Sequence, residues 1–255
     1  MIEQELQSLH SWEALTGLRE SVLDQLDHAF GPGRGGIRHD LWVVEKALGL
    51  HKGYYSQSGQ DKFVNDEILK GREGGVFLEL GGFDGITGSN SLFFERDLGW
   101  TGLLIEPSPT RFAQAASVRQ CTCLNLAVGA PAPEAEFLDI RSGYVQSSGL
   151  LGSMDPDIVR RIREHPDHEE HIARIPVRSI RDILEDAGID RIDYVSLDVE
   201  GGEMAVLETF PFETVAVEVW SIENLADSAE IPGFMAGKGY EVVEFIGLDE
   251  IYTAV

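Results

Sequence analysis

Two groups of residues in this 255-residue chain have types and spacings that could support chemistry. In the first, the stretch GGFDG (residues 81–85) follows one apolar run, and Glu106 ends the next. Glycines at the end of a strand let the backbone turn tightly beneath a phosphate or a nucleoside. In the second group, Asp198, Glu200 and Glu203 follow a later apolar run. Carboxylates in such a place can act as general bases or bind a metal ion.

The residues around the glycines favour a nucleoside over a phosphate. Phe83 stands where the dinucleotide pattern G-x-G-x-x-G requires its middle glycine, and the phosphate-binding pattern G-x-x-x-x-G-K-[ST] occurs nowhere in the chain. Glu79 and Asp84 place negative charge beside the turn, which would repel a phosphate and attract a cation. S-adenosylmethionine, a nucleoside that carries a sulfonium and an ammonium group, fits these requirements and is the predicted cofactor.

Further polar residues are expected to contact this cofactor. Glu106 would accept hydrogen bonds from the ribose hydroxyls, as the corresponding acid does in dinucleotide-binding folds. Ser89 and Asn90 would cap the following helix and contact the carboxylate end of the cofactor.

Methyl transfer requires an aligned acceptor and a base that removes its proton. Asp198 is the predicted base or base-orienting residue and Glu200 the second catalytic candidate, because ligands of α/β sheets bind beyond the carboxyl ends of the strands. Glu203 is explained equally well as an acid in the first turn of a helix. A metal is the alternative: Asp198, Glu200 and Glu218 could hold Mg²⁺, with Asn224 as a further ligand, and lower the pKa of an acceptor hydroxyl.

Short apolar runs that alternate with helical patterns must position these residues, which predicts an α/β fold. Such alternation is typical of a mostly parallel sheet with helices on both faces. The last two runs, joined by GLDE, predict a hairpin and therefore an antiparallel last strand. Strands are expected at 76–80, 102–106, 122–126, 192–197, 214–219, 240–246 and 251–255, and helices at 108–117 and 179–187 among others.

The chain divides into two predicted parts. Residues 1–52 have helical spacing and form a small helical appendage, and residues 53–255 form the α/β domain. Within the latter, 141–175 interrupts the alternation with a hydroxyl-rich loop and a charged helical stretch, which predicts a lid over the site. The three histidines of this stretch belong to a solvated helix face rather than a metal site, because they do not share one face of a helix.

Composition restricts the partners and the compartment. Forty-four acidic against 20 basic residues give a net charge of −24, which disfavours nucleic acid and anionic membranes as partners. No apolar run resembles a signal peptide or approaches a membrane span, so a cytoplasmic protein is expected. Cys121 and Cys123 are too close for a usual disulfide and lack zinc-site spacing, so they are expected to be buried strand residues.

Four segments, in order, resemble the FkbM family of S-adenosylmethionine-dependent methyltransferases. They are FLELGGFDGITGSNSLFFERDLGWTGLLIEPSPTRF, LNLAVG, IPVRSIRDIL and IDYVSLDVEGGEMAVLETF, and the resemblance extends over residues 54–255. It implies a class I methyltransferase fold with a Rossmann-like sheet, and methylation of a hydroxyl oxygen on a sugar, polyketide or other secondary metabolite. The chain departs from many members in having Glu79 for Asp and Gly82-Phe83 for Ala-Asn.

The resemblance also implies roles for individual residues. Glu79, Gly81 and Gly85 resemble the first cofactor motif, and Glu106 the ribose-binding acid, while Asn125 and Ala127 resemble the adenine edge. The expected acceptor is a small molecule or a glycan, and the N-terminal helices could mediate a homo-oligomer. Two alternatives stay open: N- or C-methylation on the same fold, and a cofactor-binding module without catalytic activity. An NAD-dependent oxidoreductase is disfavoured by Phe83.

Overall fold

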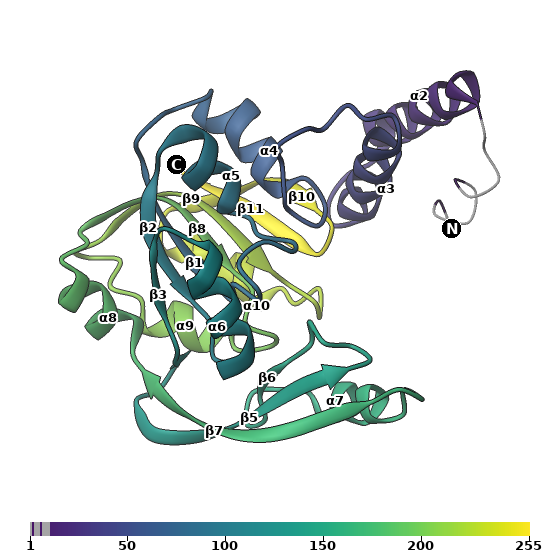
Figure 1. Ribbon diagram of the computed structural model, residues 1–255. Helices are drawn as coiled ribbons and strands as arrows, with labels where there is room; N and C mark the ends of the chain where they lie inside the picture. The colour runs from purple at the N-terminus through teal and green to yellow at the C-terminus, as the bar shows by residue number, and fades with distance from the viewer. Residues whose placement is uncertain (1, 3–5, 7–10) are drawn as a thin grey trace.

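The computed structural model describes residues 2, 6 and 11–255, and its centre is a seven-stranded sheet (Figure 1). The strand order is β10-β11-β9-β8-β1-β2-β3. The strands are β1 (Val76–Leu80), β2 (Thr101–Ile105), β3 (Thr122–Leu124), β8 (Arg191–Leu197), β9 (Ala216–Glu223), β10 (Tyr240–Ile246) and β11 (Asp249–Ala254). All seven correspond to predicted strands, so the predicted α/β fold is confirmed at the level of its main sheet.

Strand direction also follows the prediction. The pairs among β3, β2, β1, β8 and β9 are parallel, whereas β11 is antiparallel to both of its neighbours. The predicted hairpin therefore exists, but its second strand lies inside the sheet, between β9 and β10, rather than at the edge.

The largest error in a predicted strand boundary, four residues at the end of β9, bears on the site. The predicted strand 214–219 is β9, which runs on to Glu223 because Trp220, Ser221 and Ile222 stay buried and pair with β11. Glu218 therefore lies early in β9, beside the start of β8, and Glu223 occupies the carboxyl end.

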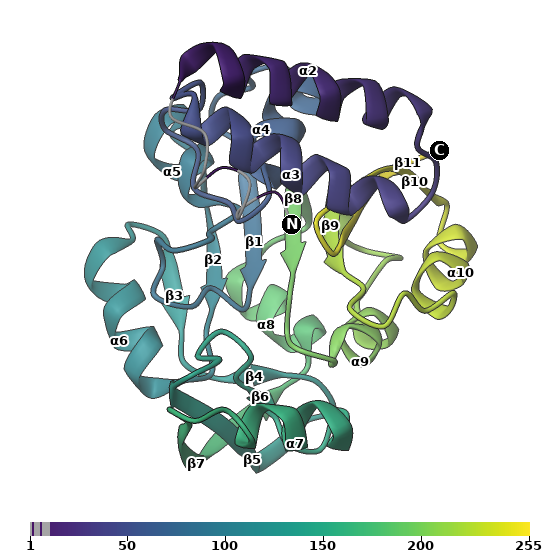
Figure 2. The ribbon, with the colours of Figure 1, turned by 90° about the vertical axis from the view of Figure 1, so that its right-hand side faces the viewer.

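Helices cover both faces of this sheet (Figure 2). Side chains from α8 (Ile180–Ala187), α9 (Glu203–Thr209) and α10 (Glu230–Gly237) build the core on one face. The π-helix η1 (Val64–Leu69), which continues α4 (Gln60–Phe63), and α5 (Leu92–Leu98) pack on the other. The predicted helices 108–117 and 179–187 are α6 (Pro109–Val118) and α8, each capped by a serine at its N-terminus.

A second, four-stranded sheet lies beyond the carboxyl ends of the main strands, at the bottom of Figure 1. It consists of β4 (Ala127–Val128), β5 (Ala132–Ser142), β6 (Gly149–Leu150) and β7 (Glu169–Arg178), with the helix α7 (Pro156–Arg163). The predicted charged helix is therefore wrong in its second half. Ala173, Ile175 and Val177 alternate along β7 and pack on Phe137, so the period of two determines the structure despite the high charge.

The N-terminal appendage is helical within the described residues. α2 (Trp12–His28) and α3 (Gly33–Ala47) form an antiparallel pair around a small apolar core. The prediction for residues 1, 3–5 and 7–10 lies outside the described part. Arg34 and Arg38 of α3 bind Glu244 of β10, and Gly247 N donates to Gly35 O at 2.9 Å. Across the described residues, no helix is long and apolar enough to cross a membrane.

Candidate active site

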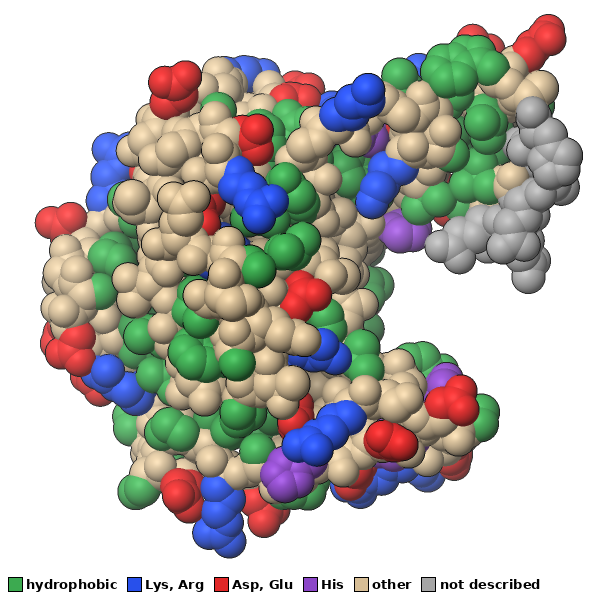
Figure 3. All heavy atoms as spheres, in the orientation of Figure 1, with side chains coloured by type: hydrophobic (Ala, Val, Ile, Leu, Met, Phe, Trp, Pro, Cys, Tyr) green, Lys and Arg blue, Asp and Glu red, His purple; other side chains and the backbone are tan. Residues whose placement is uncertain are grey.

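A cavity of about 300 Å³ lies where the parallel strands end. It is bounded by Gly81 after β1, Glu106 after β2, Asp198 after β8 and Glu223 at the end of β9. Residues of the four-stranded sheet and its loops close the other side: Ala127, Val128, Phe137, Gln146, Ser147, Ser148, Leu150 and Ser153. Figure 3 shows the molecule deeply hollowed between this lower part and the N-terminal helices. The hydroxyl-rich part of the predicted lid therefore faces the cavity.

The turn after β1 requires glycine at one position in particular. Gly81 has a φ of +87°, and a Cβ there would lie 1.8 Å from the carbonyl oxygen of Asp198. The amides of Gly81 and Gly82 donate to the carbonyl of Ile105 at 2.9 and 3.2 Å. Glycine is therefore required at residue 81 because the residue that follows β8 packs directly against it.

Glu106 is buried beside this turn and held by two amides. Its carboxylate accepts from Phe83 N at 2.8 Å and from Ser108 N at 2.7 Å. Burial raises the pKa of Glu106 to about 7, although these amide hydrogen bonds act in the opposite direction. Each oxygen keeps acceptor capacity toward the cavity, which suits the paired hydroxyls of a ribose.

Raised carboxyl pKa values make the stability of the ligand-free protein depend on pH. Burial raises the pKa of Glu106 to about 7 and that of Asp61 to about 6, so these groups bind more protons folded than unfolded. The free energy of unfolding should therefore fall as pH rises through these values, opposed in part by His51, whose pKa burial lowers. We expect a lower melting temperature at about pH 8 than at about pH 5. The variant Glu106→Gln with Asp61→Asn should reduce this dependence in part, because burial also raises the pKa of Glu200 to about 7 and that of Asp249 to about 6. A melting temperature that rises with pH would contradict the assignment.

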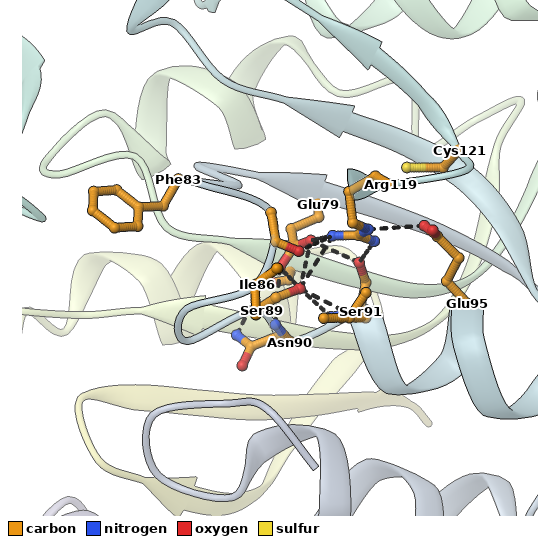
Figure 4. A network of polar contacts seen from close by, with 12 residues as sticks. Glu79, Phe83, Ile86, Ser89, Asn90, Ser91, Glu95, Arg119 and Cys121 are labelled. Atoms are coloured by element: carbon orange, nitrogen blue, oxygen red, sulfur yellow. Dashed lines mark hydrogen bonds and ion pairs between the residues drawn. The ribbon is translucent and has the colours of Figure 1, made fainter. Parts of the chain in front are cut away.

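Glu79 is anchored by its own neighbours (Figure 4). Its carboxylate accepts from Ser89 Oγ (2.9 Å), Asn90 N (2.8 Å), Ser91 Oγ (2.7 Å) and Arg119 Nη1 (3.0 Å). It therefore organises the loop before α5, while still bordering the cavity. The side chain of Asn90 donates to Ser196 Oγ at 2.9 Å and leaves its own Oδ1 buried without a partner.

Three predicted cofactor residues do not reach the cavity wall. Asp84 turns back to its own loop and accepts from the amides of Ile86 and Thr87 at 2.9 and 2.7 Å. Gly85 packs where a Cβ would meet α6, 2.9 Å from Ala115 Cα. Asn125 donates to the carbonyls of Glu106 and Pro107. These residues shape the loops, whereas Glu79, Gly81, Ser89, Asn90, Glu106 and Ala127 line the cavity as predicted.

Carboxylates gather at the other end of the cavity. Asp198, Glu203 and Glu223 each offer an oxygen, and these three atoms lie within 4.8 Å of one another. Burial, together with the nearby acids, raises the pKa of Asp198 and of Glu223 well above the usual range for a carboxyl. Glu200 also lines the cavity, and burial and the charge of Glu203 raise its pKa to about 7.

Glu218 does not belong to this group, so the predicted position of this metal ligand is wrong. Its carboxylate binds Arg72 Nη1 at 2.5 Å and Nη2 at 2.7 Å. It lies beside Asp193, five residues or roughly 16 Å along the strands from Asp198. Glu223 takes the expected place, and the apolar residues Trp220 and Ile222 beyond the predicted end of β9 were the signal that could have revealed it. Asn224 donates to Glu250 and to the carbonyl of Ser228 instead.

The remaining candidates lie elsewhere. His165, on the loop after α7, stacks edge-on against Tyr144, His168 contacts Glu170 at 2.8 Å, and His171 lies on β7. They do not share a helix face, because the predicted helix ends before them, and the metal-binding geometry found within the described residues does not include them. The two cysteines are free and partly buried.

A mixed sheet covered by helices on both faces, with a cavity at the carboxyl ends of its parallel strands, defines an α/β protein of the kind found among methyltransferases. The model of the methyltransferase FkbM domain matches residues 79–242, and the chain belongs to this methyltransferase family.

No curated protein matches the sequence. Among solved structures, a methyltransferase FkbM from Methylobacillus flagellatus KT matches with 13% identity and a TM-score of 0.48. The match covers 92% of this chain and 58% of that one, so this chain spans little more than half the length of that protein.

Proposed function

We propose that the protein is an S-adenosylmethionine-dependent methyltransferase of the class I fold that methylates a hydroxyl group of a small molecule, secondary metabolite or glycan. The observation that carries this proposal is the cavity where Gly81, Glu106 and Asp198 converge from the ends of three parallel strands. In an α/β sheet, ligands bind at this edge. Membership of the FkbM family supports the reaction class.

The residues at one end of the cavity suit the cofactor. Gly81 and Gly82 line the cavity, and Glu106 offers acceptors for the ribose hydroxyls. Ala127 lines the adenine side of the cavity. The cofactor supplies an electrophilic methyl group.

Residues that also border a second cavity suit the acceptor. Asp198 borders both this cavity and a second one of about 300 Å³, and Asn90 and Glu223 are shared in the same way. Polar side chains dominate the second cavity, among them His39, Gln57, Ser58, Gln60 and Asp249. Such a lining fits a molecule with several hydroxyl groups. In our proposal Asp198 accepts the hydroxyl proton, Glu200 is the second catalytic candidate, and the serine-rich loop before α7 excludes water.

One observation favours N-methylation as a second candidate. Among the described residues, the acids around Asp198 form no ion pair with a basic side chain, and an amine acceptor would supply positive charge there. Mass spectrometry of the product distinguishes the two, because N- and O-methyl products fragment differently.

The cofactor assignment is tested by the variant Glu106→Gln. Calorimetry should show binding of S-adenosylhomocysteine to the wild type and no comparable binding of NAD. Replacing the carboxylate with an amide keeps the shape but loses charge-assisted hydrogen bonds to the ribose, so affinity should fall by about tenfold or more. A variant that melts like the wild type and binds with equal affinity would remove Glu106 from the ribose site.

A further inference from the structure

Acidic side chains line up across three neighbouring strands at the acceptor end of the cavity. Asp198 and Glu223 follow the paired residues Leu197 and Ile222, and Glu223 in turn pairs with Asp249. The helix α9 adds Glu203 from its first turn. Like charges placed opposite each other across strands are destabilising, so this arrangement has a cost unless something offsets it.

Other buried acids of the protein are stabilised by ion pairs with arginine side chains. Glu79 and Glu95 share the buried Arg119, and Glu244 binds Arg34 and Arg38. Within the described residues, no ion pair involves the row of acids formed by Asp198, Glu223 and Asp249, and none involves Glu203. Arg111, the one basic side chain that lines the first cavity in the described chain, stacks over Phe83 with its guanidinium carbon 4.3 Å from the ring centre.

Two buried acceptor atoms at this place have no donor among the residues that the structure describes. Glu223 is 9% exposed and Asn90 7% exposed, and Glu223 Oε2 and Asn90 Oδ1 are both buried without a hydrogen-bond partner. Both residues line the two cavities that meet here. Because a buried acceptor without a partner is costly, these atoms point to a ligand that donates or is positively charged.

We propose that Asp198, Glu203 and Glu223 bind a divalent cation of the Mg²⁺, Mn²⁺ or Ca²⁺ type at the junction of the two cavities. Their three oxygens lie within 4.8 Å of one another. Around Mg²⁺ with ligands at about 2.1 Å, oxygens lie about 3 to 4.2 Å apart, and around Ca²⁺ they reach about 4.8 Å. A divalent ion offsets two negative charges where an ammonium group offsets one, which favours the metal for three converging carboxylates.

The metal would hold the acceptor hydroxyl and lower its pKa. This catalytic role rests on the proposed function, whereas the proposal that a metal binds here is independent of it. Glu203 is suited to orient the site because its Oε1 already accepts from the amides of Val199 and Gly201 at 3.0 and 3.2 Å. Both hydrogen bonds use Oε1, so Oε2 of Glu203 is available as a metal ligand.

The test is a titration of chelator-treated protein with Mn²⁺, followed by electron paramagnetic resonance. Wild type should bind one Mn²⁺ per chain, displaced by Mg²⁺ or Ca²⁺. Glu223→Gln and Glu203→Gln should each weaken binding by about tenfold or more, because each removes a charged ligand. Glu203→Gln keeps an oxygen that can accept from the two amides, so this variant should fold. It therefore keeps the test informative if Glu223→Gln does not fold. Glu200→Gln is the matched control: it removes equal charge nearby but no ligand, and should change affinity by less than about threefold.

Absence of stoichiometric Mn²⁺ binding to the wild type would overturn the proposal. So would equal weakening by Glu200→Gln, since that would indicate diffuse attraction, or displacement of Mn²⁺ by an amine acceptor rather than by Mg²⁺ or Ca²⁺. The cofactor assignment of the proposed function is tested separately, by measuring S-adenosylhomocysteine binding in the presence of EDTA. If that binding persists while Mn²⁺ does not bind, the cofactor assignment stands and the metal site fails.

Discussion

Asp198→Asn is expected to reduce methyl-transfer turnover by roughly two or more powers of ten. Asparagine keeps the shape of the side chain but cannot accept the acceptor proton, and it is a weaker metal ligand. Asp198 borders both cavities, and its side chain is not among the proposed contacts to the ribose or the adenine. Affinity for S-adenosylhomocysteine should therefore change by less than about threefold.

Turnover is measured with labelled cofactor and an acceptor found by screening, and affinity by calorimetry. Asp190→Asn provides a matched control, because Asp190 is exposed just before β8, at the opposite end of that strand. Its turnover should equal that of the wild type. Full activity in Asp198→Asn, with Asp190→Asn also active, would show that another group removes the acceptor proton.

The second large effect concerns stability. Arg119 is fully buried and binds Glu79 Oε2 at 3.0 Å, Glu95 Oε2 at 2.9 Å and Ser91 Oγ at 2.7 Å. Replacing it with methionine keeps much of the volume but leaves two buried carboxylates without a counter-charge. Breaking a buried ion pair from one side costs about 3 to 5 kcal/mol, so Arg119→Met should lower the free energy of unfolding by about this amount.

Urea unfolding followed by fluorescence measures this loss. Arg160→Met is the control, because Arg160 forms only exposed ion pairs on α7 and should leave the unfolding midpoint unchanged. Adding Glu79→Gln and Glu95→Gln to Arg119→Met should recover part of the loss, since the uncompensated charges disappear together. An Arg119→Met protein as stable as the wild type would mean that water or relaxed neighbours replace the guanidinium.

The main sheet was predictable because its strands are short apolar runs with clear boundaries. β1 and β10 match their predicted spans, and the others differ by a few residues. The four-stranded sheet was not predicted, since β5 and β7 carry many exposed charges and bury only alternate residues. In such strands half of the residues face solvent, and their polarity obscures the period of two.

The candidate site was predictable where one residue follows a strand directly, as Gly81, Glu106 and Asp198 do. It was not predictable where tertiary pairing decides the neighbours. Glu223 was missed because the end of β9 depends on its pairing with β11, and Asp249 because it was assigned to the hairpin turn. Glu79 was assigned to the cofactor, but its bonds to Arg119 and to the serines before α5 depend on a partner 40 residues away.

The position of β11 inside the main sheet has a consequence for how the molecule assembles during synthesis. β10 leaves the ribosome before β11, yet it reaches the sheet only through β11, which pairs with it on one side and with β9 on the other. Until residues 249–254 have emerged, β9 keeps an open edge that other chains could pair with. Asp249 arrives with this strand, so the row of acids is completed in the same late event. A chain that exposes this edge therefore lacks part of the candidate site, and the step that ends its risk of misassembly also completes the lining of the second cavity.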